Sequence, residues 1–115
     1  MRSLAEWGKE CHEGMQAKGF RRTPISVLDG AAAAGELMLV VSELAEAMEE
    51  LRQPGVREVY YSEGGKPEGI GPELADATLR LLGLCHAWGI DIEKFMEEKN
   101  AYNKTRTMGH GGKKF

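Results

Sequence analysis

The stretch LMLVVSELAEAMEELR, residues 37–52, decides the fold of this chain. Its apolar residues recur at the spacing of one helix face, and its acids fall on a neighbouring arc. The pattern predicts a long amphipathic helix from about residue 29 to residue 52, where the sequence QPG ends it. The predicted buried face is Leu37, Val40, Leu44, Met48 and Leu51, and the acidic stripe Glu36, Glu43, Glu46 and Glu50 borders it.

Three further helices are predicted by the same periodicity. They cover residues 3–19, about 72–88 and about 91–105. Gly19 is placed to end the first of them, and the sequence GID separates the last two. The start signals are a capping box of Ser3 with Glu6, then Pro72, then Asp91.

The segment 54–71 interrupts the helical pattern. Within it, REVYY has the composition of a strand and EGGK that of a tight turn, so a small hairpin or a flap is expected there. The predicted fold class is therefore all-α. We expect a helical bundle of about four helices, with a long loop or small hairpin between helices two and three.

Composition narrows the classes of function. A length of 115 residues predicts one domain spanning 1–115. The net charge of -3 gives no reason to expect nucleic acid as a partner. No apolar run reaches the roughly 18 residues that a membrane helix needs, so we expect no membrane partner. The only cysteines, Cys11 and Cys85, match no zinc or disulfide framework, which favours a cytoplasmic location.

Two similar acidic steps stand out, ELAE at 43–46 and ELAD at 73–76. Each places two carboxylates three residues apart, and neighbouring helices can bring both pairs to one point. Such a group of negative charges requires bound cations or protons. Ligation by carboxylates alone favours Mg²⁺, with Mn²⁺ as a possible substitute. Surface helices also carry many glutamate pairs, so the spacing alone leaves a solvated acidic face open as the other interpretation.

The two tetrapeptides and their flanks resemble a known family. They are similar to the MazG-like all-α nucleoside triphosphate pyrophosphohydrolases, in particular to a phage and bacterial MazG-like subgroup. The resemblance covers most of residues 37–115. The segments that carry it are LMLVVSELAEAMEELR (37–52), GKPEGIGPELADATLRLLGL (65–84), GIDIEKFMEEKNAYNKTR (89–106) and HGGKKF (110–115).

The resemblance implies hydrolysis of a nucleoside triphosphate, or its deoxy form, to the monophosphate and pyrophosphate. It also implies four acids that bind Mg²⁺, which by position are Glu43, Glu46, Glu73 and Asp76. Many relatives carry an extra glutamate where this chain has Ser42. A shifted alignment would therefore offer Glu49 or Glu50 in place of one or two of these ligands.

The implied reaction is chemically consistent with an acidic site. A triphosphate carries several negative charges, so Mg²⁺ is needed to bridge the carboxylates and the phosphates. A carboxylate that is not fully used as a ligand can accept the proton of the attacking water. Glu46 is expected in this catalytic role.

A basic and aromatic face on the predicted fourth helix is the candidate for substrate binding. Lys99, Tyr102, Asn103 and Arg106 follow one another at i, i+3, i+4 and i+7, and Lys113 lies in the glycine-rich tail beyond them. Lysine and arginine can hold phosphates. The alternative for this end of the chain is a solvated, frayed terminus.

Two other classes of function remain open. One is a non-catalytic helical interaction module that retains the fold, and its mark would be motif acids paired with Arg80 or with lysines. The other is a related phosphohydrolase acting on a nucleoside diphosphate or a dinucleotide-like ester. In each case we expect a homodimer or homotetramer, because a single helical hairpin leaves apolar surface uncovered and the resemblance points the same way.

Overall fold

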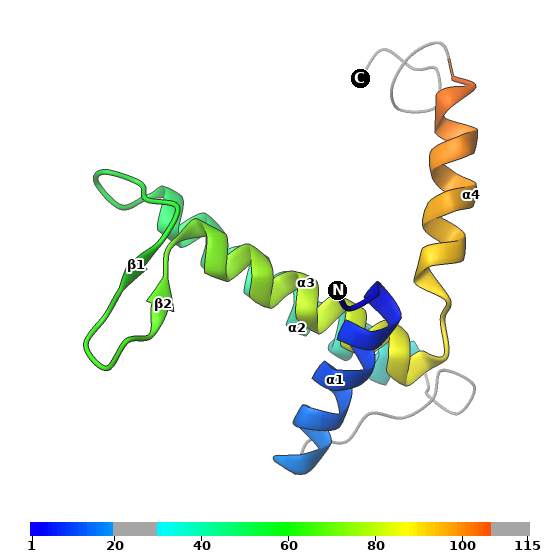
Figure 1. Cartoon of the computed structure of the whole chain (residues 1–115), viewed down its shortest axis with the longest axis horizontal. Coiled ribbons are helices and arrows are strands. Elements are labelled where there is room, and N and C mark those ends of the chain that lie inside the picture. The colour runs from blue at the N-terminus through cyan, green and yellow to red at the C-terminus, as the bar shows by residue number, and fades with distance from the viewer. Residues whose placement is uncertain (20–29, 107–115) are drawn as a thin grey trace.

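The computed structural model describes residues 1–19 and 30–106. It confirms the predicted all-α class, with four helices and one small hairpin between the second and the third (Figure 1). The elements are α1 (Leu4–Ala17), α2 (Gly30–Leu51), β1 (Tyr60–Tyr61), β2 (Pro67–Glu68), α3 (Ile70–Trp88) and α4 (Ile92–Lys104).

The long helices α2 and α3 lie side by side and run in opposite directions, while α1 packs across the later part of α3 (Figure 1). Gly8 makes the crossing of α1 and α3 possible. A Cβ atom at this position would lie 2.5 Å from the carbonyl oxygen of Leu82. The absence of a side chain therefore sets how closely the two backbones approach.

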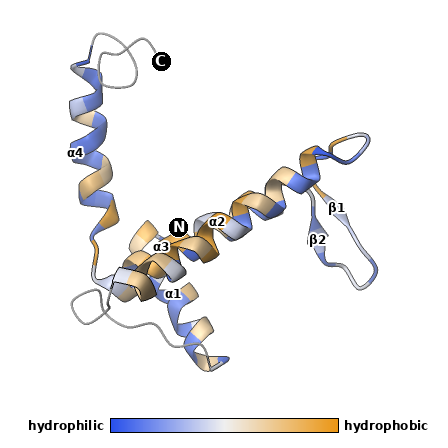
Figure 2. Cartoon of the chain, turned by 180° about the vertical axis from the view of Figure 1, so that it is seen from behind, coloured by the Kyte–Doolittle hydropathy of each residue, from blue (hydrophilic) through white to orange (hydrophobic). Residues whose placement is uncertain are grey.

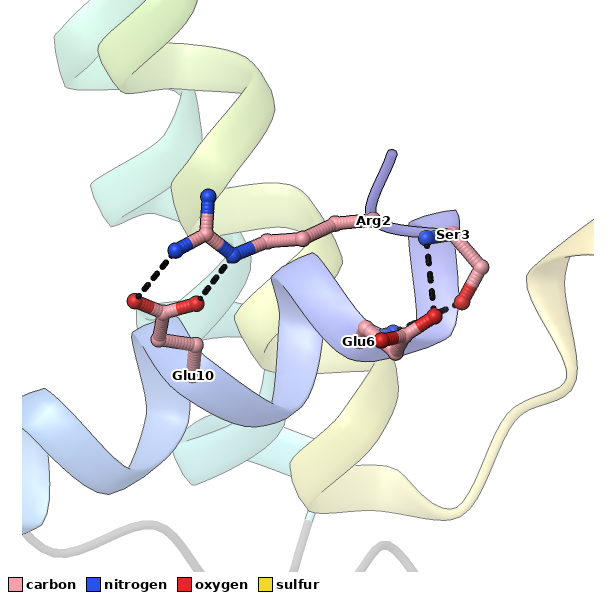
Figure 3. Close-up of polar contacts among 4 residues, drawn as sticks. All are labelled: Arg2, Ser3, Glu6 and Glu10. Atoms are coloured by element: carbon pink, nitrogen blue, oxygen red, sulfur yellow. Dashed lines mark hydrogen bonds and ion pairs between the residues drawn. The ribbon is translucent and has the colours of Figure 1, made fainter.

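The start of α1 is formed as its sequence predicts (Figure 3). The hydroxyl of Ser3 accepts from the amide of Glu6 at 3.1 Å, and the Glu6 carboxylate accepts from the amide of Ser3 at 3.1 Å. The bonds that the Glu6 carboxylate accepts from Ser3, first from its backbone amide and then from its side chain, lower the pKa of Glu6 because they stabilise its ionised form. Arg2 adds a two-pronged ion pair with Glu10, with Nε 2.7 Å from Oε2 and Nη2 3.3 Å from Oε1.

The other helix ends follow the predicted signals with one shift. Asp91 caps α4 by accepting from the amide of Lys94 at 3.3 Å. Helix α3 begins at Ile70, two residues before the predicted start at Pro72. The reason is Gly69, which has a φ of 114° and lies against the carbonyls of Arg57 and Glu58, where a side chain would not fit.

The hairpin is short and is anchored to α3. Its strands are antiparallel, with Tyr60 opposite Glu68 and Tyr61 opposite Pro67. The amide of Gly71, in the first turn of α3, donates to the carbonyl of Glu58 at 2.8 Å. The hairpin predicted as a possibility for residues 54–71 is therefore present, and it continues directly into the helix that follows.

The predicted buried face of α2 is wrong for the single chain. Leu37, Leu44, Met48 and Leu51 are each 45–58% exposed, and Val40 is half-buried. The buried residues of α2 are instead Glu43 and Ala47. The physical reason is that α2 packs on α3 through the acid-and-alanine edge of its surface. The apolar periodicity identified a hydrophobic face correctly but could not show what, if anything, covers it.

The core of the single chain is correspondingly small. Within residues 1–19 and 30–106, the buried hydrophobic residues lie on α2 and α3: Ala47, Ala77, Leu82, Leu84 and Cys85. Hydrophobic colour covers much of α2 and α3, whereas α4 is mostly hydrophilic beyond its start (Figure 2). Helix α4 buries none of its own residues and extends away from the α2–α3 pair (Figure 1). Among the described residues, no helix is both long and apolar enough to cross a membrane.

Candidate metal centre

Three carboxylates meet where the second half of α2 faces the first turns of α3. Oxygens of Glu43, Glu73 and Asp76 all lie within 4.8 Å of one another. Helical geometry explains the arrangement, since Glu73 and Asp76 are three residues apart on one face of α3, and the antiparallel α2 presents Glu43 to that face. We call these three residues the acid triad.

Glu46 lies beside the triad, next to Glu73. The pKa of Glu73 is raised, first because its carboxyl is removed from water. The charge of Glu46 and a hydrogen bond between the two side chains raise it further, followed by the charges of Asp76 and Glu43. All four acids predicted as ligands are therefore close together, with Glu46 at the edge of the group.

One oxygen of the group lacks a hydrogen-bond partner. Glu73 Oε2 is buried and accepts no hydrogen bond from any described residue. A buried carboxylate oxygen without a donor carries a desolvation cost that a bound cation or a proton would remove. This is the feature expected of a ligand atom whose partner is not part of the protein.

A cation of the chain already contacts the triad. Arg80 Nε lies 2.5 Å from Glu43 Oε1. The Glu43 side chain is only 11% exposed, while that of Arg80 is 33% exposed. Arg80 follows Asp76 by one helical turn, so it extends the same face of α3.

The rest of the acidic stripe of α2 is held by uncharged donors. Trp88 Nε1 donates to Glu36 Oε2 at 3.1 Å near one end of the helix. The Tyr60 hydroxyl lies 3.2 Å and 3.3 Å from the two oxygens of Glu50 near the other end. Helical spacing could not predict either contact, because each partner lies in another element of the fold than its acid.

Glu49 and Glu50, the alternative ligands offered by a shifted alignment, have partners of their own outside the triad. Glu50 is bonded to Tyr60, and Glu49 forms an exposed ion pair with Arg52 at 3.1 Å. Neither belongs to the acid triad. The geometry thus favours the register in which ELAE, rather than a later pair, faces ELAD.

Three of the predicted substrate-binding residues, Lys99, Tyr102 and Asn103, lie on α4, and Arg106 lies two residues beyond its end. Lys99 Nζ lies 5.5 Å and the Arg106 guanidinium 4.7 Å from the centre of the Tyr102 ring. Asn103 is exposed on the same helix, and Lys113 lies outside the described residues. The group is at the far end of the fold from the hairpin, so one chain does not bring it to the acids (Figure 1).

Comparisons with protein-family models, with curated proteins and with solved structures found no significant match.

Proposed function

We propose that this protein hydrolyses a nucleoside or deoxynucleoside triphosphate to the monophosphate and pyrophosphate, in a reaction that depends on Mg²⁺. The observation that carries the proposal is the convergence of Glu43, Glu73 and Asp76 on one point. The resemblance of ELAE and ELAD to the MazG-like motifs supports the choice of substrate.

The residues of the triad fit a hard divalent cation. All the available donors are carboxylate oxygens, which suit Mg²⁺ and accept Mn²⁺ in its place. Glu73 Oε2 offers a buried oxygen with no competing donor among the described residues. A bound Mg²⁺ would supply Lewis-acid polarisation of a phosphate and neutralise the charge of the triphosphate.

Glu46 is the residue that we assign to proton transfer. Its carboxylate lies beside Glu73 but outside the closely spaced triad, and its side chain is exposed. A carboxylate in this position can accept the proton of a water that attacks the substrate, while Glu43, Glu73 and Asp76 hold the cation.

We further propose a homodimer or homotetramer as the working form. Among the described residues, several large apolar side chains of α2 are about half exposed, among them Leu44 and Met48. A contiguous exposed apolar face of this kind is typical of a surface that another protein chain covers. In such an assembly the basic face of α4 from one copy would be free to approach the acids of another. A cytoplasmic location, which the cysteine usage favours, belongs to the same proposal.

A second candidate is a helical interaction module without catalytic activity. The observation in its favour is the ion pair between Glu43 and Arg80, since an acid held by an arginine is not free to bind a metal. The two candidates differ in their response to Mg²⁺.

The test is pyrophosphate release from a panel of canonical and modified triphosphates, with Mg²⁺ and with EDTA. Release that requires Mg²⁺ and is lost in Glu43→Gln and in Asp76→Asn supports the enzyme. Glu49→Gln is the matched control, because it removes an acid of the same helix that lies outside the triad. A folded protein that binds no Mg²⁺ and releases no pyrophosphate would favour the interaction module. Orthophosphate or two monophosphates as products would favour the related hydrolases.

A further inference from the structure

Arg80 differs from the other paired cations of the described residues in contacting an acid of the triad, Glu43. The ion pairs of the described residues include Arg2 with Glu10, Arg52 with Glu49 and Lys66 with Glu68, and these three lie away from the triad. In the described part of the chain, the pair of Arg80 with Glu43 is the one that reaches an acid of the triad. It also joins α3 to α2, so it depends on how the two helices pack.

The pair joins a nearly buried carboxylate to a partly exposed guanidinium. Glu43 is nearly buried, and its ionised carboxylate requires a cation because little water can reach it. Arg80 is one-third exposed and has a long side chain, so it can leave the contact toward solvent without unfolding the helix. A divalent cation among three carboxylates outcompetes a single positive charge for the same oxygen.

We propose that Arg80 is a displaceable counter-ion: it pairs with Glu43 while the acids hold no metal, and it pairs with a phosphate oxygen of the substrate once a divalent cation occupies the triad. This inference rests on the proposed function. It assigns Arg80 a positioning role for the substrate in addition to its electrostatic role in the metal-free protein. The guanidinium suits both partners, since it forms the same charge-assisted hydrogen bonds with carboxylates and phosphates.

If Arg80 exchanges Glu43 for a phosphate, replacing Arg80 should change the affinity for the metal and the affinity for the nucleotide in opposite directions. Removing Arg80 eliminates a competitor for Glu43 and a positive charge near the cation, so the metal should bind more tightly in the absence of nucleotide. Removing it also eliminates a phosphate partner, so the nucleotide should bind less tightly. A residue with only a structural role in holding α2 against α3 would weaken both.

The experiment measures Mn²⁺ binding without nucleotide, by electron paramagnetic resonance, and the KM and kcat of triphosphate hydrolysis. In Arg80→Gln we expect Mn²⁺ affinity to rise at least about fivefold. We expect KM to rise about tenfold with a smaller change in kcat. Arg80→Lys retains the charge and should lie between Arg80→Gln and the wild type in both measurements. Arg52→Gln is the matched control, since it breaks an exposed arginine–glutamate pair outside the triad and should change neither.

Unchanged or weaker Mn²⁺ binding in a folded Arg80→Gln would overturn the inference while leaving the metal site intact. If Arg80→Gln does not fold, Arg80→Met, which keeps an apolar stem and removes the charge, decides by the same criterion. If the wild-type protein itself binds no Mn²⁺, the proposed function fails and this inference fails with it, so the two failures are distinguishable.

Discussion

Glu43 and Glu73 present their carboxylates to each other across the α2–α3 contact, although the whole hairpin separates them in the sequence. Burial and the neighbouring acids raise the free energy of the ionised form of Glu73. The ionised Glu73 is therefore a local source of destabilisation that a proton or a bound cation would relieve.

The first prediction concerns pH. Burial and the neighbouring acids raise the pKa of Glu73 above its ordinary value of 4.5 in the folded protein. The folded state then holds this proton more tightly than the unfolded chain does. The contribution to stability is fully present below the unfolded pKa and is lost as pH rises through the folded pKa.

This dependence is measured by thermal unfolding in EDTA from pH 4 upward, where the wild type should lose more stability with rising pH than Glu73→Gln. At neutral pH, Glu73→Gln should unfold a few degrees above the wild type. Equal profiles for the two proteins would show that Glu73 is not perturbed in solution.

The second prediction concerns the metal. A cation that binds only the folded state raises the free energy of unfolding by about 2.7 kcal/mol at a concentration one hundred times its Kd. We expect Mg²⁺ to raise the Tm at neutral pH and EDTA to reverse the effect. Glu43→Gln should lose most of this increase, whereas Glu49→Gln should keep it. A rise in Tm of the same size in both variants would mean that the ion binds elsewhere.

The third prediction concerns the crossing of α1 and α3. Gly8→Ala places a methyl group against the Leu82 carbonyl and should destabilise the fold by about 1–3 kcal/mol, because the backbones must separate. Gly14→Ala, in the same helix with nothing within 4 Å, should stabilise it by roughly 0.5–1 kcal/mol. Chemical denaturation of both variants checks the pair, and a neutral Gly8→Ala would contradict the close crossing.

The fourth prediction concerns assembly. Leu44 is 45% exposed on the apolar side of α2, so a charge there should not disturb the single chain. If a second copy covers this face, Leu44→Glu should shift the protein toward monomer in sedimentation analysis and leave its helical content unchanged. Lys9→Glu, exposed on α1, should not change the mass. A monomeric mass for the wild-type protein at high concentration would contradict the proposed homo-oligomer.

Local rules accounted for much of the fold, because the relevant forces act between residues that are close in the sequence. The capping box of Ser3 and Glu6 and the cap at Asp91 form as predicted. The choice of which side of α2 is buried could not be obtained in this way. That choice depends on how α3 packs against α2 and on whether another surface covers Leu44 and its neighbours.

In the candidate site, too, local spacing predicted some features, whereas contacts between different elements could not be predicted. Helical spacing was enough to place Glu73 with Asp76 on one face, and the match of ELAE to ELAD indicated the partner helix. The ligand roles themselves remain predictions. Two contacts join residues from different elements, so no local sequence pattern predicts them. They are the contact of Tyr60 with Glu50 and that of Trp88 with Glu36.

The hairpin has a consequence for the kind of ion that the acids could enclose. It is tied to the start of α3 through Gly71 and Glu58, and to the end of α2 through Tyr60 and Glu50. It thus fixes the spacing of the two helices at the end where the acids meet. Mg²⁺ requires oxygens at about 2.0–2.1 Å and Ca²⁺ accepts them at about 2.3–2.6 Å. We therefore expect the preference for the smaller ion to depend on the length and rigidity of the hairpin, a part of the chain that supplies no ligand.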